Sequence, residues 1–144
     1  MVADSLRRKS LDIELHMLVW SVVLGLVHIV TASHAASLQH GYRWTASARD
    51  QEVASLTGVA GRLDRALRNF SETFPLFAAL VFAAHAVGRH NALTESGAVL
   101  YFAARLAYLP LYAFGVPLVR SLVWNVAALG MTLMLVALLW KPAG

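Results

Sequence analysis

The sequence contains no cysteine, and this absence excludes three kinds of chemistry at once. The chain forms no disulfides, offers no thiolate ligands to a metal and has no cysteine nucleophile. Any thiol that takes part in its chemistry must therefore arrive with a bound molecule. Charge is also scarce, because only 14% of the 144 residues are Asp, Glu, Lys or Arg. A soluble domain of this size needs a more heavily charged surface.

Hydrophobic residues are abundant instead. They make up 58% of the chain, and the mean hydropathy is +0.60. This composition indicates an integral membrane protein in which residues 1–144 form one domain, with the lipid bilayer as its surroundings and no nucleic acid among its partners. The formal net charge of +4 suits anionic lipid headgroups or an anionic ligand, and it does not choose between them.

Four apolar stretches are long enough to cross a membrane. A span needs about 20 mostly apolar residues to cross a hydrocarbon core of about 30 Å. Its backbone must be helical, because open strands would leave polar groups unpaired in lipid. We expect helices at residues 13–38, 65–87, 96–114 and 116–140. Short connections make neighbours antiparallel, so the predicted fold is an all-α membrane protein, an up-down bundle of four transmembrane helices.

Local signals bear on the helix ends and on the orientation. Thr94 is a candidate cap for the third helix, Gly115 can end that helix, and Pro117 can begin the fourth. Each side of the predicted bundle carries five basic residues. The distribution of positive charge therefore leaves the orientation in the membrane open.

The second predicted helix opens on a group of polar side chains within the segment "RALRNFSETFP", residues 65–75. The members of this group are Arg65, Arg68, Asn69 and Glu72. Their spacing of three and four residues puts them on one helical face. Charged groups inside a span cost a few kcal/mol or more near its centre, so each requires an explanation. We expect Arg68 and Glu72 to pair along the helix.

Further polar side chains stand on the third predicted helix and at the start of the fourth. The third predicted helix carries Tyr101, Arg105, Tyr108 and Tyr112. The fourth begins with Arg120, Ser121 and Trp124. Antiparallel packing can bring four of the polar residues to one membrane face, in one polar pocket: Glu72, Tyr108, Tyr112 and Arg120. Such a pocket suits a small zwitterionic ligand, because arginines bind carboxylates by bidentate hydrogen bonds. The alternative is that these residues pair with one another and fix the bundle.

The segment "RALRNFSETFP" resembles the second-helix signature of the MAPEG family (membrane-associated proteins in eicosanoid and glutathione metabolism). The stretches "ARLAYLPLY" and "VRS" also look like this family, which has a Tyr late in the third helix and an Arg-Ser pair early in the fourth. The resemblance covers nearly the whole chain. It is closest to a short bacterial branch similar to microsomal glutathione transferases.

This resemblance implies a homotrimer in the bacterial inner membrane, with the N-terminus away from the cytoplasm. It also implies glutathione bound between subunits near the cytoplasmic face, for transferase or peroxidase chemistry on small lipophilic substrates. The residues implied at this site are Arg65, Arg68, Asn69, Glu72, Tyr108, Arg120 and Ser121. Arg120 and Ser121 are the catalytic candidates, because a cation and a hydroxyl donor can stabilise the glutathione thiolate.

The sequence departs from the family pattern at three places, and the first two of these departures favour an alternative function. Ala104 stands where microsomal prostaglandin E synthase has a His, and Trp124 stands where it has a Tyr. Arg43 is only a loose match to an arginine that some relatives have near the first helix. The alternative function is a non-catalytic accessory or structural subunit of a larger membrane complex.

The histidines do not predict a metal site. Along the first helix, His16, His28, His34 and His40 follow one another at intervals of 12, 6 and 6 residues. Metal-binding pairs on a helix need a spacing that keeps both side chains on one face, and six residues does not. We therefore expect these histidines, and His85 on the second helix, to pack and hydrogen-bond. A proton relay is the remaining alternative.

Overall fold

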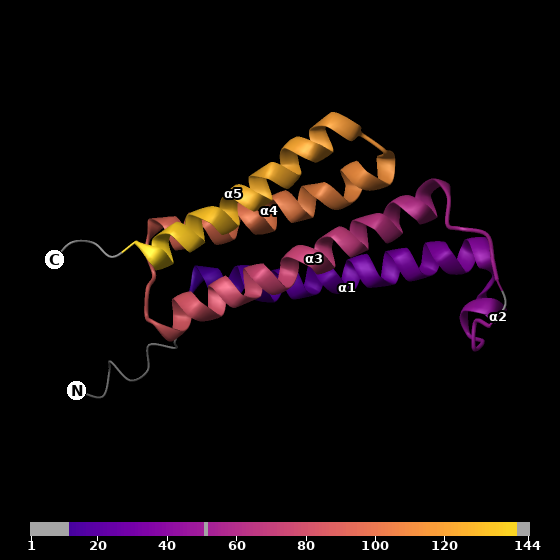
Figure 1. The fold of residues 1–144 in the computed structure, drawn as a ribbon, viewed down its shortest axis with the longest axis horizontal. Coiled ribbons are helices and arrows are strands. Elements are labelled where there is room, and N and C mark those ends of the chain that lie inside the picture. The colour runs from indigo at the N-terminus through magenta and orange to yellow at the C-terminus, as the bar shows by residue number, and fades with distance from the viewer. Residues whose placement is uncertain (1–11, 51, 141–144) are drawn as a thin grey trace, which may run out of the picture.

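The computed structural model describes residues 12–50 and 52–140, and within these ranges the chain is helical and has no strand. Its helices are α1 (Ile13–His40), α2 (Tyr42–Thr45), α3 (Gly58–Ala86), α4 (Ala92–Phe114) and α5 (Pro117–Leu139). The long ones lie side by side, and consecutive long helices run in opposite directions (Figure 1). At the α2 end of the molecule, α1 ends, α3 begins and α4 turns into α5. At the opposite end, which we call the N-terminal end, α1 begins and α3 turns into α4.

The turns around α4 follow from local hydrogen bonding. Asn91 caps α4, because its side-chain oxygen accepts from the backbone N–H groups of Leu93 at 2.9 Å and Thr94 at 3.1 Å. The Thr94 hydroxyl accepts from the Asn91 N–H in return, so Thr94 is the partner in a capping box and the prediction that it is the cap was wrong. Gly115 ends α4 at a φ of 76°, and Pro117 begins α5, as predicted.

Helix α3 begins at Gly58, earlier than the predicted start at residue 65. Thr57, immediately before it, has extended backbone angles. Arg62 in the first turns donates from Nε to the carbonyl oxygen of Ala113 at 2.9 Å, which ties the start of α3 to the end of α4. The sequence pattern placed this segment in a loop because Gly58 and Gly61 are typical of loops, whereas the structure makes both part of the first turns of α3.

Three helices in the described residues, α1, α4 and α5, are long and apolar enough to cross a membrane. Helix α3 falls short of this measure, contrary to the count of four. Its first half carries Asp64, Arg65, Arg68 and Glu72 and its last turn carries His85, so the apolar stretch between them is short. The role of α3 as a fourth span stays a prediction.

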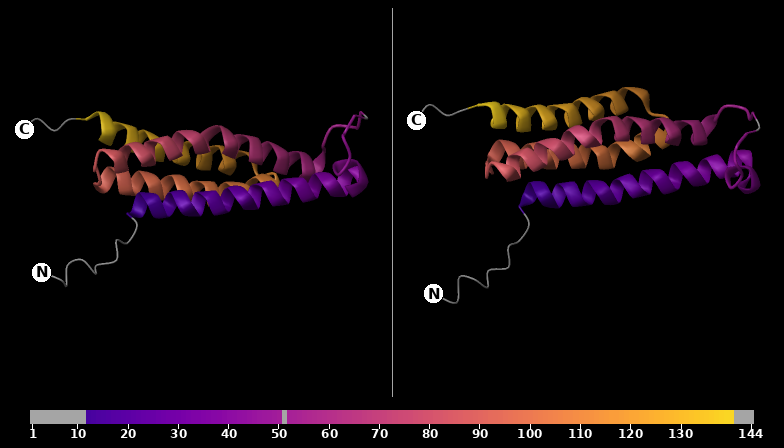
Figure 2. Two further views of the ribbon diagram at one scale, coloured as in Figure 1. Left: turned by 90° about the horizontal axis from the view of Figure 1, so that it is seen from below. Right: turned by 60° about the horizontal axis from the view of Figure 1, so that its bottom comes forward.

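The long helices form one closely packed pair, α4 with α5, and α1 and α3 pack against them. The closest approach is between α4 and α5, where a Cβ atom built on Gly97 would lie 2.6 Å from the backbone oxygen of Gly130. Helix α1 packs on α3 and α4, and α3 also contacts α4 and α5 (Figure 2). The main core consists of Leu18, Phe77, Val81, Ala98, Tyr101, Ala104, Ala127 and Met134. Large apolar side chains such as Val27, Phe82 and Leu122 are exposed, as expected for helices that face lipid.

Candidate functional site

Three buried tyrosines and one buried arginine form a stripe along α4. Tyr101, Arg105, Tyr108 and Tyr112 follow one another at intervals of three or four residues, so they share the face that turns towards α3 and α5. The stripe crosses from the main core at Tyr101 to a smaller cluster at the α2 end, which contains Tyr108, Tyr112 and Ala66.

Arg105 is the most deeply buried cation among the described residues, at 1% exposure. Its Nη1 donates to the side-chain oxygen of Asn69 at 2.7 Å. Its guanidinium carbon lies 5.5 Å from the ring centre of Tyr101 and 5.4 Å from that of Tyr108. Its Nε and Nη2 atoms are buried and have no hydrogen-bond partner. The cation therefore keeps unused donors, although buried polar groups are normally satisfied.

Arg105 was not among the predicted ligand contacts. The sequence feature that could have pointed to Arg105 is its position between Tyr101 and Tyr108 at helical spacing, which places these residues on one face. Spacing alone does not reveal that the face is buried, or that Asn69 on another helix reaches the guanidinium.

Tyr112 brings two further arginines together at the α2 end. The guanidinium carbon of Arg120, on the first turn of α5, lies 4.6 Å from the Tyr112 ring centre. That of Arg65, on α3, lies 6.0 Å from the same ring. Both distances are within the range of a cation–π interaction. Within the described residues, Arg65, Arg105 and Arg120 form no ion pair with a carboxylate.

A pocket of about 220 Å³ lies beside this group. It is lined by Asn69, Tyr108, Arg120, Ser121, Trp124 and Asn125. The predicted residues Asn69, Tyr108, Arg120 and Ser121 are thus brought together from α3, α4 and α5. The departing residue Trp124 also lines the pocket, whereas Ala104 is buried in the main core.

The other predicted contacts lie outside the pocket lining. Arg68 is exposed and bonds through Nη2 to the carboxylate of Asp64 at 2.5 Å. The predicted pair of Arg68 with Glu72 is therefore wrong: both partners lie four residues from Arg68, and the bond forms with the earlier one. Glu72 is exposed and forms no ion pair in the described part of the chain. Arg43 lies on α2 and does not line the pocket.

Ser121 makes a backbone hydrogen bond. Its hydroxyl donates to the carbonyl oxygen of Pro117 at 3.2 Å, and its own carbonyl accepts from the Asn125 amide at 2.8 Å. The hydroxyl oxygen keeps its accepting lone pairs on the exposed side of α5. Rotation about the side chain is needed before Ser121 can donate to a group in the pocket.

A larger hollow of about 680 Å³ lies around α2. All of its lining residues come from the local stretch 40–50, so it is the concavity of a loop. The pocket at Asn69 differs, because three helices contribute side chains to it, and these side chains include both hydrogen-bond donors and hydrogen-bond acceptors. It is therefore the candidate functional site.

Long helices with exposed apolar side chains define an integral membrane protein built from α-helices, and its polar pocket lies at one end of these helices. The model of the MAPEG family matches residues 17–140, which include nearly all of α1 and the whole of α2 to α5. The chain belongs to the MAPEG family. Among curated proteins, none matches the chain.

Proposed function

We propose that the chain is a glutathione-dependent transferase or peroxidase that acts on lipophilic substrates in a bacterial inner membrane. The observation that carries this proposal is the set of three arginines, Arg65, Arg105 and Arg120, which surround the tyrosines of α4 without a carboxylate partner in the described residues. None of the three forms a direct ion pair there, although the charge of Glu72 acts on Arg105 from a distance, so an anionic ligand can add a direct partner. Glutathione carries two carboxylates and is the ligand that the family resemblance implies.

The residues present fit this ligand. Arg120 can bind a carboxylate through two parallel N–H groups. The Asn69 oxygen is already used by Arg105, so its amide N–H groups are left to donate into the pocket. The Tyr108 hydroxyl adds a donor and acceptor at the pocket wall. Buried Arg105 fixes the Asn69 side chain by its hydrogen bond and adds positive charge near the pocket. Its Nε and Nη2 atoms have no hydrogen-bond partner.

The size of the pocket supports a trimer. At about 220 Å³ it is smaller than the roughly 300–1,000 Å³ of most ligand sites. A neighbouring subunit against the exposed face of α3 encloses a larger site, in which Arg68 and Glu72 also face the ligand. A subunit contact on this face also shields the charged side chains of α3, such as Arg68 and Glu72, from lipid. With these charges shielded, α3 can serve as the fourth spanning helix.

The chemistry assigned to the pocket is stabilisation of negative charge on sulfur. Glutathione, when bound, supplies a thiol whose thiolate form attacks an electrophile. Arg120 stabilises that negative charge, and it does so at the start of α5, where the helix dipole adds positive potential. Ser121 rotates away from Pro117 to donate a hydrogen bond. Lipophilic substrates reach the pocket along exposed apolar side chains of α5 such as Leu118 and Leu122.

Turnover in liposomes tests the proposal. The purified protein is given glutathione with a lipophilic aryl halide or an organic hydroperoxide, and the loss of free thiol is followed. We expect turnover by the wild type and a loss of at least tenfold in Arg120→Ala. The matched control Arg49→Ala removes an exposed arginine that donates to the carbonyl oxygen of Thr45 at the end of α2, and it keeps full activity.

The same experiment distinguishes an enzyme from a non-catalytic accessory subunit. Trp124 lines the pocket at the position where microsomal prostaglandin E synthase has a Tyr. The loss of this hydroxyl favours a protein that binds a ligand without converting it. Binding of glutathione without turnover of either substrate class would refute the enzymatic proposal and support a non-catalytic subunit. Light scattering of the detergent complex gives the oligomeric state, for which we expect three copies.

A further inference from the structure

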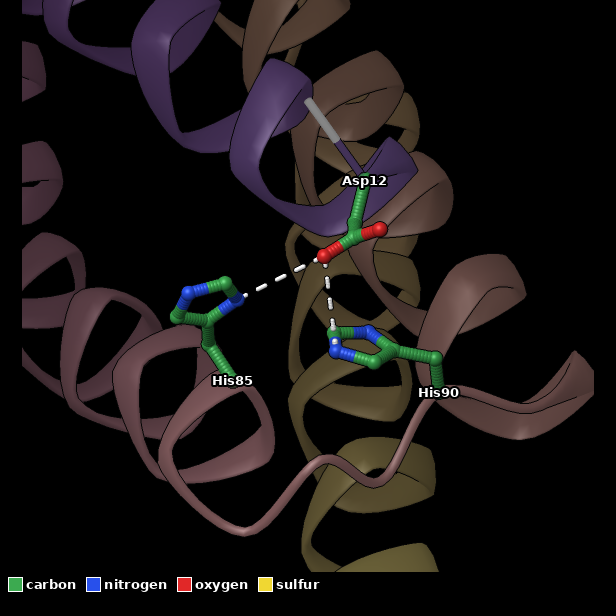
Figure 3. A group of neighbouring side chains, drawn as sticks. All are labelled: Asp12, His85 and His90. Atoms are coloured by element: carbon green, nitrogen blue, oxygen red, sulfur yellow. Dashed lines mark ion pairs between the residues drawn. The ribbon is translucent and has the colours of Figure 1, made fainter. Parts of the chain in front are cut away.

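A second cluster of titratable side chains lies at the N-terminal end, far along the helices from the candidate glutathione pocket. Asp12 immediately precedes α1, His85 lies in the last turn of α3, and His90 lies in the turn before α4 (Figure 3). The Oδ2 atom of Asp12 is 3.4 Å from His85 Nδ1 and 3.4 Å from His90 Nε2. The three atoms lie within 4.8 Å of one another. Two imidazole nitrogens and one carboxylate oxygen thus converge from three separate segments.

These separations agree with tetrahedral coordination. Zinc binds nitrogen and carboxylate oxygen at about 2.0–2.2 Å, and a tetrahedron with bonds of this length has edges of about 3.3–3.6 Å. Two of the three edges in the cluster already have this length. An octahedral cation with bonds of 2.0–2.1 Å brings neighbouring ligands to about 2.9 Å, which is closer than the side chains lie. Imidazole ligands also favour zinc over magnesium or calcium.

Glu14 supplies an independent indication of a cation. This carboxylate is 1% exposed, and within the described residues it has no lysine or arginine partner. Its Oε1 lies 3.3 Å from His90 Nδ1 and accepts a hydrogen bond from the Thr94 hydroxyl at 2.5 Å. Its Oε2 is buried without a partner. Burying a carboxylate is costly unless positive charge compensates it.

The arrangement around His90 is the one that metal-binding histidines commonly adopt. One ring nitrogen, Nε2, faces the Asp12 oxygen, and the other, Nδ1, faces the Glu14 carboxylate. A carboxylate on the far nitrogen fixes the orientation of the ring and makes the coordinating nitrogen more basic. Thr94 in turn holds Glu14, because its hydroxyl belongs to the capping box of α4.

We propose that Asp12, His85 and His90 bind a divalent transition metal of the zinc type, with Glu14 as the residue that orients His90. Three protein ligands leave a fourth position for water. The metal joins the start of α1 to the turn between α3 and α4, so that it fastens the N-terminal end of the molecule. This proposal does not depend on the glutathione site, which lies at the α2 end.

Metal titration of the protein in detergent tests the proposal, with a purification that uses no polyhistidine tag. Binding of Zn²⁺ is measured by calorimetry, and Co²⁺ serves as a probe whose visible absorption reports tetrahedral geometry. Mg²⁺ is the comparison cation. The variants are His85→Ala and His90→Ala, which change exposed side chains, and the matched control is His34→Ala on the far half of α1.

We expect one Zn²⁺ per chain, a tetrahedral Co²⁺ spectrum and no saturable binding of Mg²⁺. Each of His85→Ala and His90→Ala weakens Zn²⁺ binding at least tenfold, whereas His34→Ala binds as the wild type does. Glu14→Gln weakens it by about 10- to 100-fold, the usual effect of losing a carboxylate behind a ligand. Zinc also raises the unfolding temperature of the wild type and not that of His90→Ala. The absence of saturable binding, or equal affinity in His34→Ala and His90→Ala, would overturn the proposal.

Discussion

Arg105 of α4 donates a 2.7 Å hydrogen bond from Nη1 to the side-chain oxygen of Asn69 on α3. The bond connects the segment "RALRNFSETFP" with the tyrosine stripe of α4, and its acceptor residue Asn69 lines the candidate pocket. It also explains the role of the asparagine at this place in α3, since the arginine is buried and needs an acceptor.

Replacing Asn69 with alanine should destabilise the protein. Asn69→Ala leaves Nη1 of Arg105 without its acceptor in a buried site, and this costs about 1–3 kcal/mol. Reversible unfolding in mixed micelles measures the change. Asn125→Ala is the control, because its amide bonds to a backbone carbonyl on the exposed side of α5, and the expected cost is below about 0.5 kcal/mol. Equal costs for the two variants would contradict the structural role of the Arg105 bond.

The contact between α4 and α5 should not tolerate a methyl group at Gly97. Gly97→Ala gains up to about 1 kcal/mol from helix propensity. It loses more from crowding, about 1–3 kcal/mol, because the new Cβ lies 2.6 Å from the backbone oxygen of Gly130. The balance is a lower free energy of unfolding.

Gly25→Ala is the matched control for this substitution. Its new Cβ meets the edge of the Phe70 ring at 2.9 Å, and a ring can turn aside where a backbone cannot. We expect a smaller loss than for Gly97→Ala in the same unfolding assay. A larger loss at Gly25 would show that the α4–α5 approach is looser than described.

Arg89 should act as a cap for the end of α5. Its Nη1 donates to the carbonyl oxygens of Ala137 at 2.8 Å, Leu138 at 2.9 Å and Trp140 at 3.0 Å. Arg89→Ala removes both the donors and a favourable charge at a helix C-terminus, at a cost of about 1–2 kcal/mol. Amide hydrogen exchange should increase in the last turn of α5 and stay unchanged in the exposed-residue control Arg43→Ala. Equal exchange in both variants would argue against capping.

The sequence predicted the fold better than the site, for physical reasons. Apolar length, Gly115 and Pro117 are local signals, and they located the long helices and the tight turn between α4 and α5. The early start of α3 was missed because Gly58 and Gly61 in its first turns are typical of loops. Asn91 was overlooked as a cap because Thr94, its partner in the capping box, is also a common capping residue.

Contacts between helices could not be read from spacing along one helix. Arg68 has acidic residues four positions away on both sides, and nothing in the sequence decides that Asp64 is its partner. The burial of Arg105 depends on how α3 meets α4. The spacing of histidines along a single helix does not reveal the cluster of Asp12, His85 and His90, because its members come from three segments.

Calorimetric titration with glutathione tests the central claim most directly. The account predicts saturable binding to the wild type and unchanged affinity in Arg49→Ala. In Arg120→Ala it predicts a loss of about 10- to 100-fold, which corresponds to the 1.5–3 kcal/mol of a hydrogen bond to a charged group. Equal affinity in all three proteins, or no binding to the wild type, would contradict a glutathione pocket at Arg120.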